Sequence, residues 1–357
     1  MNLYLTKSGR LRRKDNTLSF ELVSFPEATE ECLDAIDCEG AQDEQLEELP
    51  ASTKYALPIE SINAVYIFGE VSFNARLMNF LAQRHVPVHL FNYFGHHTGT
   101  FLPHAEQLSG NLVIKQSLIF ESLDKRLYIC RQLLSSVIHN IHSVVAYYER
   151  RIKSPVLTEL SNEIPKYEKC LYDARSPEEL MGIEGRVRRL YYQCWHFWLG
   201  DIAKNFRRIY HPPDTPLNSL VSFLNSLLYT TCVSELYRTA LYPGISYLHS
   251  PQTRRYSLAL DLSEPFKPVM VDRMVFRLLN SRAISDSDFL PHTNGFILSD
   301  DARKRILAEW DALIRETVFY KNLDRSVSYR QLIRLDCYKL IKHLLEEEEF
   351  KPFRMEY

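Results

Sequence analysis

Three side chains that bind metal ions well occur in sequence settings that ordinary core packing does not require. Glu184 lies between two glycines in the run MGIEGRVRRLYYQCWHFW. His249 follows the stretch YPGISYL, and Glu264 comes 15 residues later. Two carboxylates and one imidazole form a mixed oxygen and nitrogen ligand set, which suits Mg²⁺ or Mn²⁺ better than a thiolate site would. If these side chains converge in the fold, the chain is a metal-dependent enzyme of phosphoryl transfer.

Asp261 precedes Glu264 by three residues, a spacing that places two carboxylates on one face of a helix. Three roles stay open for it: holding a water molecule of the metal site, holding the outer ring nitrogen of His249, or binding a second ion transiently. Taken singly, a glutamate beside glycines is more often solvated or salt-bridged, and a histidine at a helix end is more often a cap. The case for a site therefore depends on convergence.

The glutamate at 184 should lie on a strong helix. Ser176, Pro177 and Glu179 are typical of an N-cap, a first helical residue and a capping-box partner, which predicts a helix over about 177–199. Glycine inside a helix costs roughly 0.5–1 kcal/mol relative to alanine, so we expect close backbone approach at the glycines beside Glu184. A buried stripe at helical spacing should include Ile183, Val187, Leu190, Cys194 and Phe197.

Elsewhere the hydrophobic pattern changes once along the chain. Strand-like runs such as NLYLT, TLSFELV and PVHLFN dominate to about residue 105, with one helix near 72–83. Long helical patterns follow at 111–120, 124–152, 217–228, 232–242, 267–279, 299–319 and 328–347. This predicts an α+β protein with a small N-terminal β-sandwich-like domain, residues 1–108, and a larger all-helical catalytic domain, residues 109–357. The EEEE run at 346–349, before Phe350 and the KPFRMEY tail, should form an exposed helix end; docking of the tail to a partner is the alternative.

Charge is distributed unevenly. The whole chain carries −2, but an acidic insertion at about 26–52 holds ten carboxylates between residues 26 and 49 and no Lys or Arg, which leaves +8 on the rest. That insertion is expected to be a solvated loop. Sharper alternatives are that it competes with DNA for a basic surface of the free protein or docks on the basic face of a partner. Basic side chains gather around the proposed ligands and are predicted to contact DNA phosphates: Arg186, Arg188, Arg189, Lys204, Arg254 and Arg255.

The string around Glu184, the 65-residue interval to His249 and LALDLSEPFKP around Glu264 resemble the CRISPR-associated integrases, the first protein of the Cas series. The block IESINAVYIFGEVSFNARLMNFLAQRHVPVHLFNYFGHHTGTF resembles the N-terminal part of the same family. The resemblance implies a β-sandwich-like domain that forms homodimers, and a helical catalytic domain that holds Mg²⁺ or Mn²⁺ on Glu184, His249 and Glu264. It further implies joining of DNA 3′ ends to a CRISPR repeat, double-stranded DNA as substrate, and a bridged complex with the second protein of the Cas series.

Two other functions share these residues: a structure-selective metal-dependent nuclease of branched DNA, and a non-catalytic DNA-binding scaffold in which the site residues form salt bridges. A second group of potential ligands, His85, His89, His96, His97 and His104, lacks carboxylate or thiolate partners and is better explained by a hairpin or dimer interface. No Walker-type glycine loop, G-x-S-x-G elbow or H-E-x-x-H motif occurs.

The seven scattered cysteines contain no C-x-x-C pair and are expected to be reduced thiols. No leader pattern and no apolar run of about 18 residues is present, so a cytoplasmic location without a membrane span is expected.

Overall fold

The computed structural model describes residues 1–22, 55–104, 107–209, 213–251, 256–292 and 295–356. The chain divides into two compact units, Met1–His104 and Ala105–Tyr357. The acidic insertion at 26–52 and the predicted DNA contacts Arg254 and Arg255 lie outside the described residues. The division into an independent domain over 1–108 and another over 109–357 stays a prediction.

The N-terminal unit contains two four-stranded sheets. One has the order β4-β3-β2-β6, and its hairpin turns at Asp15, whose φ of 52° is left-handed. The other has the order β1-β5-β7-β8, in which β1, β5 and β7 are parallel and β8 pairs antiparallel. The strands are β1 Asn2–Leu5, β2 Gly9–Lys14, β3 Thr17–Leu22, β4 Tyr55–Pro58, β5 Ala64–Ile67, β6 Val71–Ser72, β7 Val88–Phe91 and β8 His97–Phe101. The predicted β unit is confirmed.

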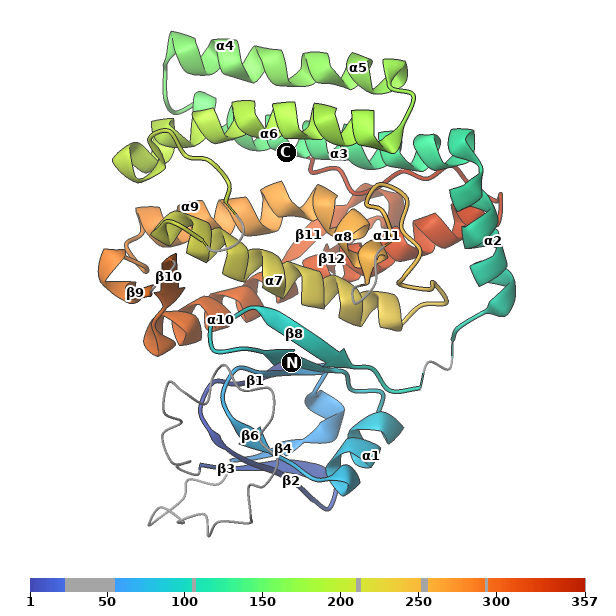
Figure 1. Cartoon of the computed structure of the whole chain (residues 1–357), viewed down its shortest axis with the longest axis vertical. Coiled ribbons are helices and arrows are strands. Elements are labelled where there is room, and N and C mark those ends of the chain that lie inside the picture. Colours follow the sequence, from blue (N-terminus) through green and yellow to red (C-terminus); the bar gives the residue numbers. More distant parts are fainter. Residues whose placement is uncertain (23–54, 105–106, 210–212, 252–255, 293–294, 357) are drawn as a thin grey trace. The chain divides into compact units, whose positions relative to one another are not determined.

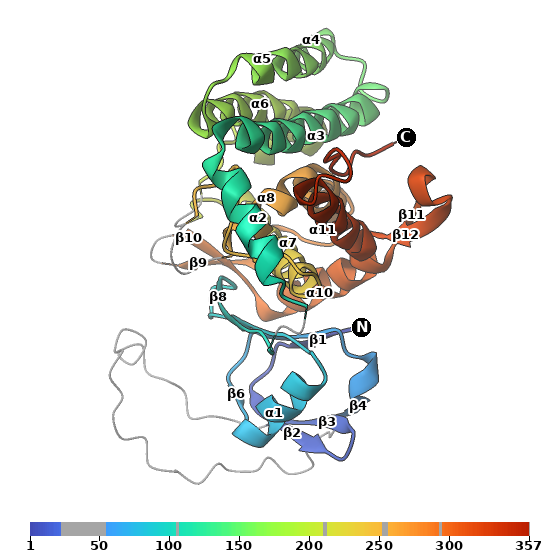
Figure 2. The same ribbon diagram turned by 90° about the vertical axis from the view of Figure 1, so that its right-hand side faces the viewer.

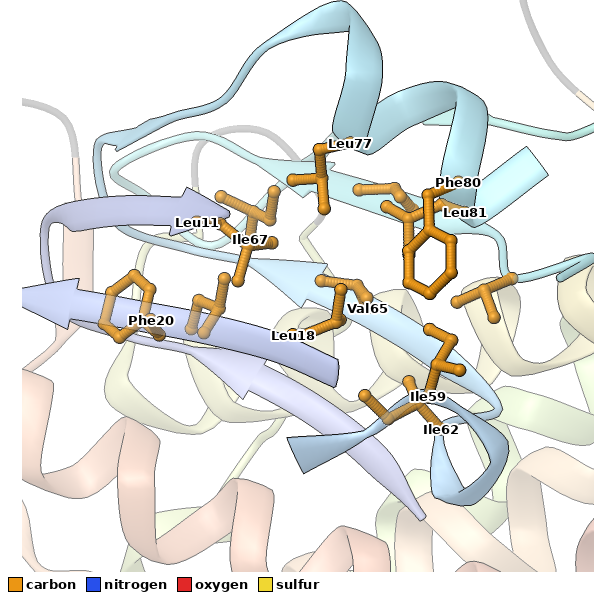
Figure 3. Packing of buried hydrophobic residues seen from close by; sticks show 13 residues of the cluster. Leu11, Leu18, Phe20, Ile59, Ile62, Val65, Ile67, Leu77, Phe80 and Leu81 are labelled. Carbon is orange, nitrogen blue, oxygen red and sulfur yellow. The ribbon is translucent and has the colours of Figure 1, made fainter. Parts of the chain in front are cut away.

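A hydrophobic cluster joins the two sheets to helix α1, Ala75–Gln83 (Figure 3). Leu11 and Leu18 reach it from β2 and β3, and Leu77 and Phe80 reach it from α1. Asn74 caps that helix by accepting a hydrogen bond from the Leu77 N–H. The helix therefore starts three residues later than residue 72, where the sequence pattern placed it.

The histidines of the N-terminal unit fit the hairpin interpretation. His89 on β7 is fully buried, its Nδ1 lies 2.9 Å from the Thr100 hydroxyl of β8, and its ring packs against Tyr66. His97 Nε2 lies 2.7 Å from the same hydroxyl. Burial lowers the pKa of His89 to about 3, so this imidazole stays neutral at physiological pH.

The second unit is mainly helical (Figure 1). Its helices are α2 Gly110–Glu121, α3 Leu123–Glu149, α4 Pro155–Glu163, α5 Tyr167–Asp173, α6 Pro177–Leu199, α7 Pro216–Tyr237, α8 Ser257–Ser263, α9 Arg273–Asn280, α10 Asp300–Arg315 and α11 Tyr329–Leu344. Helices α3 and α6 lie side by side, and α4 and α5 cover them, as both views show (Figures 1 and 2). No described helix is long and apolar enough to cross a membrane.

The predicted α+β class with a large helical second unit is confirmed, although that unit is not entirely helical. Two hairpins interrupt it, β9 Phe289–His292 with β10 Gly295–Leu298, and β11 Thr317–Tyr320 with β12 Arg325–Ser328. These strands are four residues each, too short for a clear alternating pattern.

The two helices predicted over 217–228 and 232–242 form one helix, α7, which ends at Tyr237. The helix continues through Thr230 and Thr231, whose hydroxyls both donate back to the Leu227 carbonyl, at 3.1 and 2.7 Å, and so are satisfied within the helix.

Helix α6 begins at Pro177 after the predicted N-cap, but the Glu179 carboxylate accepts from the Arg175 N–H at 2.7 Å rather than from the Ser176 N–H that a capping box requires. The Ser176 hydroxyl accepts from the Glu179 N–H at 3.2 Å, and Pro177 is the first helical residue. Its buried face is rotated slightly from the expected stripe, because Tyr191 and Trp195 are fully buried whereas Leu190 and Phe197 are only partly so. A Cβ at either glycine beside Glu184 would meet no atom within 4 Å, so the expectation of close backbone approach there is wrong.

Candidate active site

The site begins with an arginine on α6 that joins carboxylates from separate segments. Arg188 lies one helical turn after Glu184, and its Nε donates to Glu184 Oε1 at 2.8 Å. Its Nη2 donates to Glu264 Oε2 at 3.1 Å, although Glu264 is 76 residues away in the sequence. Arg188 is only 8% exposed. Two of the predicted ligands therefore meet through one buried guanidinium group.

Asp261 on α8 organises the loop that carries His249. Its Oδ2 accepts from the N–H groups of Tyr247 and Leu248, at 2.6 and 3.0 Å. Its Oδ1 accepts from the His249 N–H at 2.9 Å and lies 2.8 Å from His249 Nδ1. The Asp261 carboxylate is fully buried and has four donors around it. Of the three roles left open for Asp261, this geometry matches the one in which its carboxylate holds a ring nitrogen of His249.

The hydrogen bond to Asp261 determines which ring nitrogen of His249 carries the proton. A carboxylate only accepts, so Nδ1 carries the shared proton and Nε2 keeps a lone pair in the neutral ring. His249 Nε2 lies 3.8 Å from Glu264 Oε1. Burial alone lowers the pKa of His249, but the hydrogen bond and charge of Asp261, together with Glu264, raise it above its ordinary value.

Further contacts brace the same loop from two helices. Gln116 on α2 is fully buried, donates to the Tyr242 carbonyl at 3.2 Å and accepts from the Tyr242 N–H at 2.8 Å. Arg126 on α3 donates to the Tyr247 carbonyl at 2.7 Å. The loop is irregular, but its backbone is held by side chains that come from more than 100 residues away.

Glu264 is held in a strongly cationic setting. It begins a 3-10 turn, Glu264–Phe266, directly after α8, and Lys267 Nζ lies 2.5 Å from its Oε1. Burial alone would raise the pKa of Glu264, but the charges of Lys267 and Arg188 outweigh burial and lower it to about 2. This carboxylate therefore stays ionised at any physiological pH.

A further buried carboxylate, Asp272, was not found from the sequence. Its Oδ2 lies 3.7 Å from Arg188 Nη1, and it ends a π-helical segment, Lys267–Asp272. Pro268 in this segment has no N–H to donate, which disturbs the regular helical bonding. Burial raises the pKa of Asp272 to about 6 despite Arg188. The sequence signal for it was the string KPVMVDR, where one acid stands among apolar residues.

The donor set fits a divalent cation by its chemistry. Carboxylate oxygens of Glu184 and Glu264 with one imidazole nitrogen suit Mg²⁺ or Mn²⁺. In the described part of the chain, no three His, Cys, Asp or Glu side chains stand ready to hold a metal ion. Arg188 and Lys267 form ion pairs with the carboxylate oxygens of the site. A bound metal ion would neutralise part of the glutamate charge that Arg188 and Lys267 neutralise in this structure.

The predicted DNA contacts fall into different settings. Arg186 and Arg189 are exposed on α6, and Lys204 is exposed just after it. Arg188 was predicted to contact DNA as well, but its buried guanidinium is taken up by the carboxylates of the site. Phosphate contact by the exposed residues stays a prediction.

The fold and the site define a class of protein: a strand-rich unit and a helical unit, with acids and an imidazole brought together in the helical one. The chain belongs to the CRISPR-associated protein Cas1 family, because the family model matches residues 3–312. The family resemblance predicted from the sequence is thereby confirmed.

Relatives and solved structures agree. The chain is 40% identical over 353 residues to CRISPR-associated endonuclease Cas1 2 of Thermodesulfovibrio yellowstonii, covering 99% of this chain and 98% of the relative. It is 37% identical over 354 residues to CRISPR-associated endonuclease Cas1 of Fusobacterium nucleatum, covering 99% and 96%. The solved structure of a Cas1 protein from Thermotoga maritima superposes with a TM-score of 0.80 at 33% identity, covering 100% of both chains. A casposase bound to integration product shares the fold, with a TM-score of 0.80 at 20% identity, covering 100% of this chain and 95% of that one.

Proposed function

We propose that this chain is a metal-dependent DNA integrase of CRISPR adaptation, which joins 3′-OH ends of captured DNA to the CRISPR repeat and also cleaves DNA. Family membership and relatives named endonucleases support this proposal. The observation that carries it is the convergence of Glu184 and Glu264 on Arg188, with His249 Nε2 at 3.8 Å from Glu264. The residue types alone did not establish whether these three side chains lie close together in the fold, and a shared metal site requires that they do.

The reaction is a transesterification at phosphorus. The oxygen of a DNA 3′-OH forms a new bond to a phosphorus atom of the repeat, the bond to the repeat's own 3′ oxygen breaks, and the attacking hydroxyl's proton is released as the leaving oxygen gains one. When bound, Mg²⁺ or Mn²⁺ would supply Lewis-acid polarisation of the phosphodiester. Glu184, His249 and Glu264 would hold it. With water as the nucleophile, the same site cleaves DNA.

The remaining residues of the site prepare that geometry. Asp261 holds the tautomer that leaves Nε2 of His249 free, and it fixes the loop through three backbone N–H groups. Arg188 forms ion pairs with both glutamates and so keeps their carboxylates around one guanidinium group. Arg186, Arg189 and Lys204 are exposed and supply positive charge for the phosphates of the DNA backbone.

Partners follow from the same proposal. The substrate is double-stranded DNA, both as the captured fragment and as the repeat. A protein that shares this fold at 18% identity and a TM-score of 0.77 was solved as part of a Cas6-RT-Cas1–Cas2 complex. We propose that this chain forms a homodimer and that the second protein of the Cas series bridges two such dimers.

The test is half-site integration of a short duplex with 3′-OH ends into a plasmid that carries the repeat. Glu184→Gln and Glu264→Gln should each abolish joining with Mg²⁺ or Mn²⁺. Glu178→Gln is the matched control, because Glu178 is an exposed carboxylate on the same helix whose side chain interacts with Ser176 and Arg126 and with none of the proposed ligands. Full joining by Glu184→Gln would favour the non-catalytic scaffold and contradict the proposal.

A plasmid with a shuffled repeat separates the integrase from the structure-selective nuclease. The integrase should prefer the intact repeat boundary, whereas equal use of both plasmids favours a nuclease of branched DNA. Both enzymes would lose activity in Glu184→Gln, so target preference decides between them.

A further inference from the structure

The C-terminal tail is built into the catalytic unit. Glutamates 346–349 are exposed, as expected, but the chain then returns to the protein interior. Phe350 is fully buried, and Phe353 and Met355 are 5% and 7% exposed. The exposed end predicted at 346–349 therefore stops before Phe350. A buried tail needs partners for its backbone polar groups.

One side chain on α3 provides several of those partners. Asn140 is fully buried, and its Oδ1 accepts from the Met355 N–H at 2.7 Å. Its Nδ2 donates to the Phe353 carbonyl at 3.1 Å and to the Pro265 carbonyl at 2.7 Å. Pro265 directly follows Glu264. Asn140 thus links the tail to the peptide group next to a proposed metal ligand.

The tail contacts the same turn by a second route. The ring of Phe353 stacks on that of Phe266, with centroids 4.9 Å apart and planes at 4°. The Phe353 N–H donates to Asp336 Oδ2 on α11 at 2.7 Å. The 3-10 turn that begins at Glu264 is therefore held through Pro265 and Phe266 between the tail and α3. Both routes end one or two residues from the Glu264 carboxylate.

We propose that Asn140 and the tail residues 350–355 position Glu264 for cation binding, an inference that rests on the proposed metal-dependent function. The turn after α8 is only three residues long, and the segment after it is π-helical rather than α-helical, so contacts from α3 and the tail add to what the local backbone provides. Asn140 is a positioning residue, because it reaches the ligand only through the neighbouring carbonyl. Outer contacts of this kind typically change metal affinity 10–100-fold.

The test uses the full chain and measures Mn²⁺ affinity from the electron paramagnetic resonance signal of free Mn²⁺. Asn140→Asp keeps the acceptor for the Met355 N–H but places an oxygen against the Pro265 and Phe353 carbonyls. Its Mn²⁺ dissociation constant should rise at least about tenfold. Ser143→Ala is the matched control: Ser143 is a partly buried polar residue on the same helix, and no hydrogen bond of the described residues joins it to the tail or to Pro265. It should change the constant less than about twofold.

A positioning role has a further signature. Saturating Mn²⁺ should restore most of the DNA cleavage rate of Asn140→Asp, whereas it should not restore Glu184→Gln, which lacks a ligand. If Asn140→Asp does not fold, Phe353→Leu decides the matter, since it removes the stacking on Phe266 and keeps the backbone bonds. A raised dissociation constant there supports the proposal, and a wild-type constant overturns it.

The outcomes separate the two levels of the argument. Weak Mn²⁺ binding by Glu184→Gln with wild-type binding by Asn140→Asp overturns the positioning role and leaves the proposed function intact. Equal Mn²⁺ binding by wild type and Glu184→Gln overturns the proposed function, and the positioning role with it.

Discussion

Replacing Asp261 by asparagine tests whether the imidazole tautomer underlies metal binding. The carboxylate accepts from the backbone N–H groups of residues 247, 248 and 249 and from His249 Nδ1. An asparagine has a single carbonyl oxygen, and its amide only donates. With that oxygen toward residues 247 and 248, the amide faces His249. It then donates to Nδ1, so the proton of the imidazole moves to Nε2 and removes the lone pair needed for a metal ion.

The contacts give the magnitude. The His249 N–H loses its acceptor in the buried loop, which costs about 1–3 kcal/mol. The N–H groups of residues 247 and 248 exchange a charged acceptor for a neutral one, which costs about 1 kcal/mol for each hydrogen bond. We expect Asp261→Asn to lower the free energy of unfolding by about 3–5 kcal/mol. Loss of the correct tautomer should weaken Mn²⁺ binding about 10–100-fold.

Three measurements check this prediction. Chemical denaturation gives the stability, Mn²⁺ paramagnetic resonance gives the affinity, and nitrogen-15 spectra of labelled imidazole report which ring nitrogen of His249 carries the proton. His249→Gln is the comparison variant, because it removes the ligand but keeps the Asp261 carboxylate and its backbone bonds. It should weaken metal binding with a smaller loss of stability. Wild-type Mn²⁺ affinity together with a proton on Nε2 in Asp261→Asn would refute the reasoning.

Three further predictions follow from buried and exposed charge. Burial lowers the pKa of His89 to about 3, so its imidazole binds a proton more tightly in the unfolded chain than in the folded protein. The contribution of this residue to stability is therefore present above about pH 6.5 and is lost as the pH falls. Between pH 7 and pH 5 the free energy of unfolding should fall by about 2 kcal/mol. Hydrogen exchange of β7, corrected for intrinsic rates, should show this fall in the wild type and a much smaller one in His89→Asn. Glu235 on α7 is 2% exposed and has three arginine guanidinium groups within 4.0 Å. Glu235→Gln should lower the denaturation free energy by about 3–5 kcal/mol, while Glu309→Gln, in a half-exposed pair, should cost under about 1 kcal/mol; equal effects would contradict the burial argument. Arg189→Gln should reduce the slope of log affinity for DNA against log salt by about 1 without changing sequence preference, and an unchanged slope would remove it from the DNA surface.

Much of the architecture could be predicted because the relevant signals are local. The N-cap at Ser176 with Pro177 predicts the start of α6, and the polar pair at Asp15 and Asn16 predicts the first hairpin. Both depend on interactions within about four residues. The short hairpins of the second unit were missed because four-residue strands have little periodic signal. The continuity of α7 was missed because the polar pair Thr230 and Thr231 lies between the two predicted helices, and the structure buries both side chains within one helix.

By itself, the sequence determined which side chains could take part in the chemistry: Glu184, His249, Asp261 and Glu264 are an acid and imidazole set that residue types and a family resemblance single out. The tertiary structure decided what each one does. It assigned Asp261 to the loop and imidazole of His249, and it moved Arg188 from a predicted DNA contact to the centre of the carboxylates. The physical reason is distance along the chain. Contacts between residues 76 apart depend on how helices pack, and no pattern within a few residues encodes that packing.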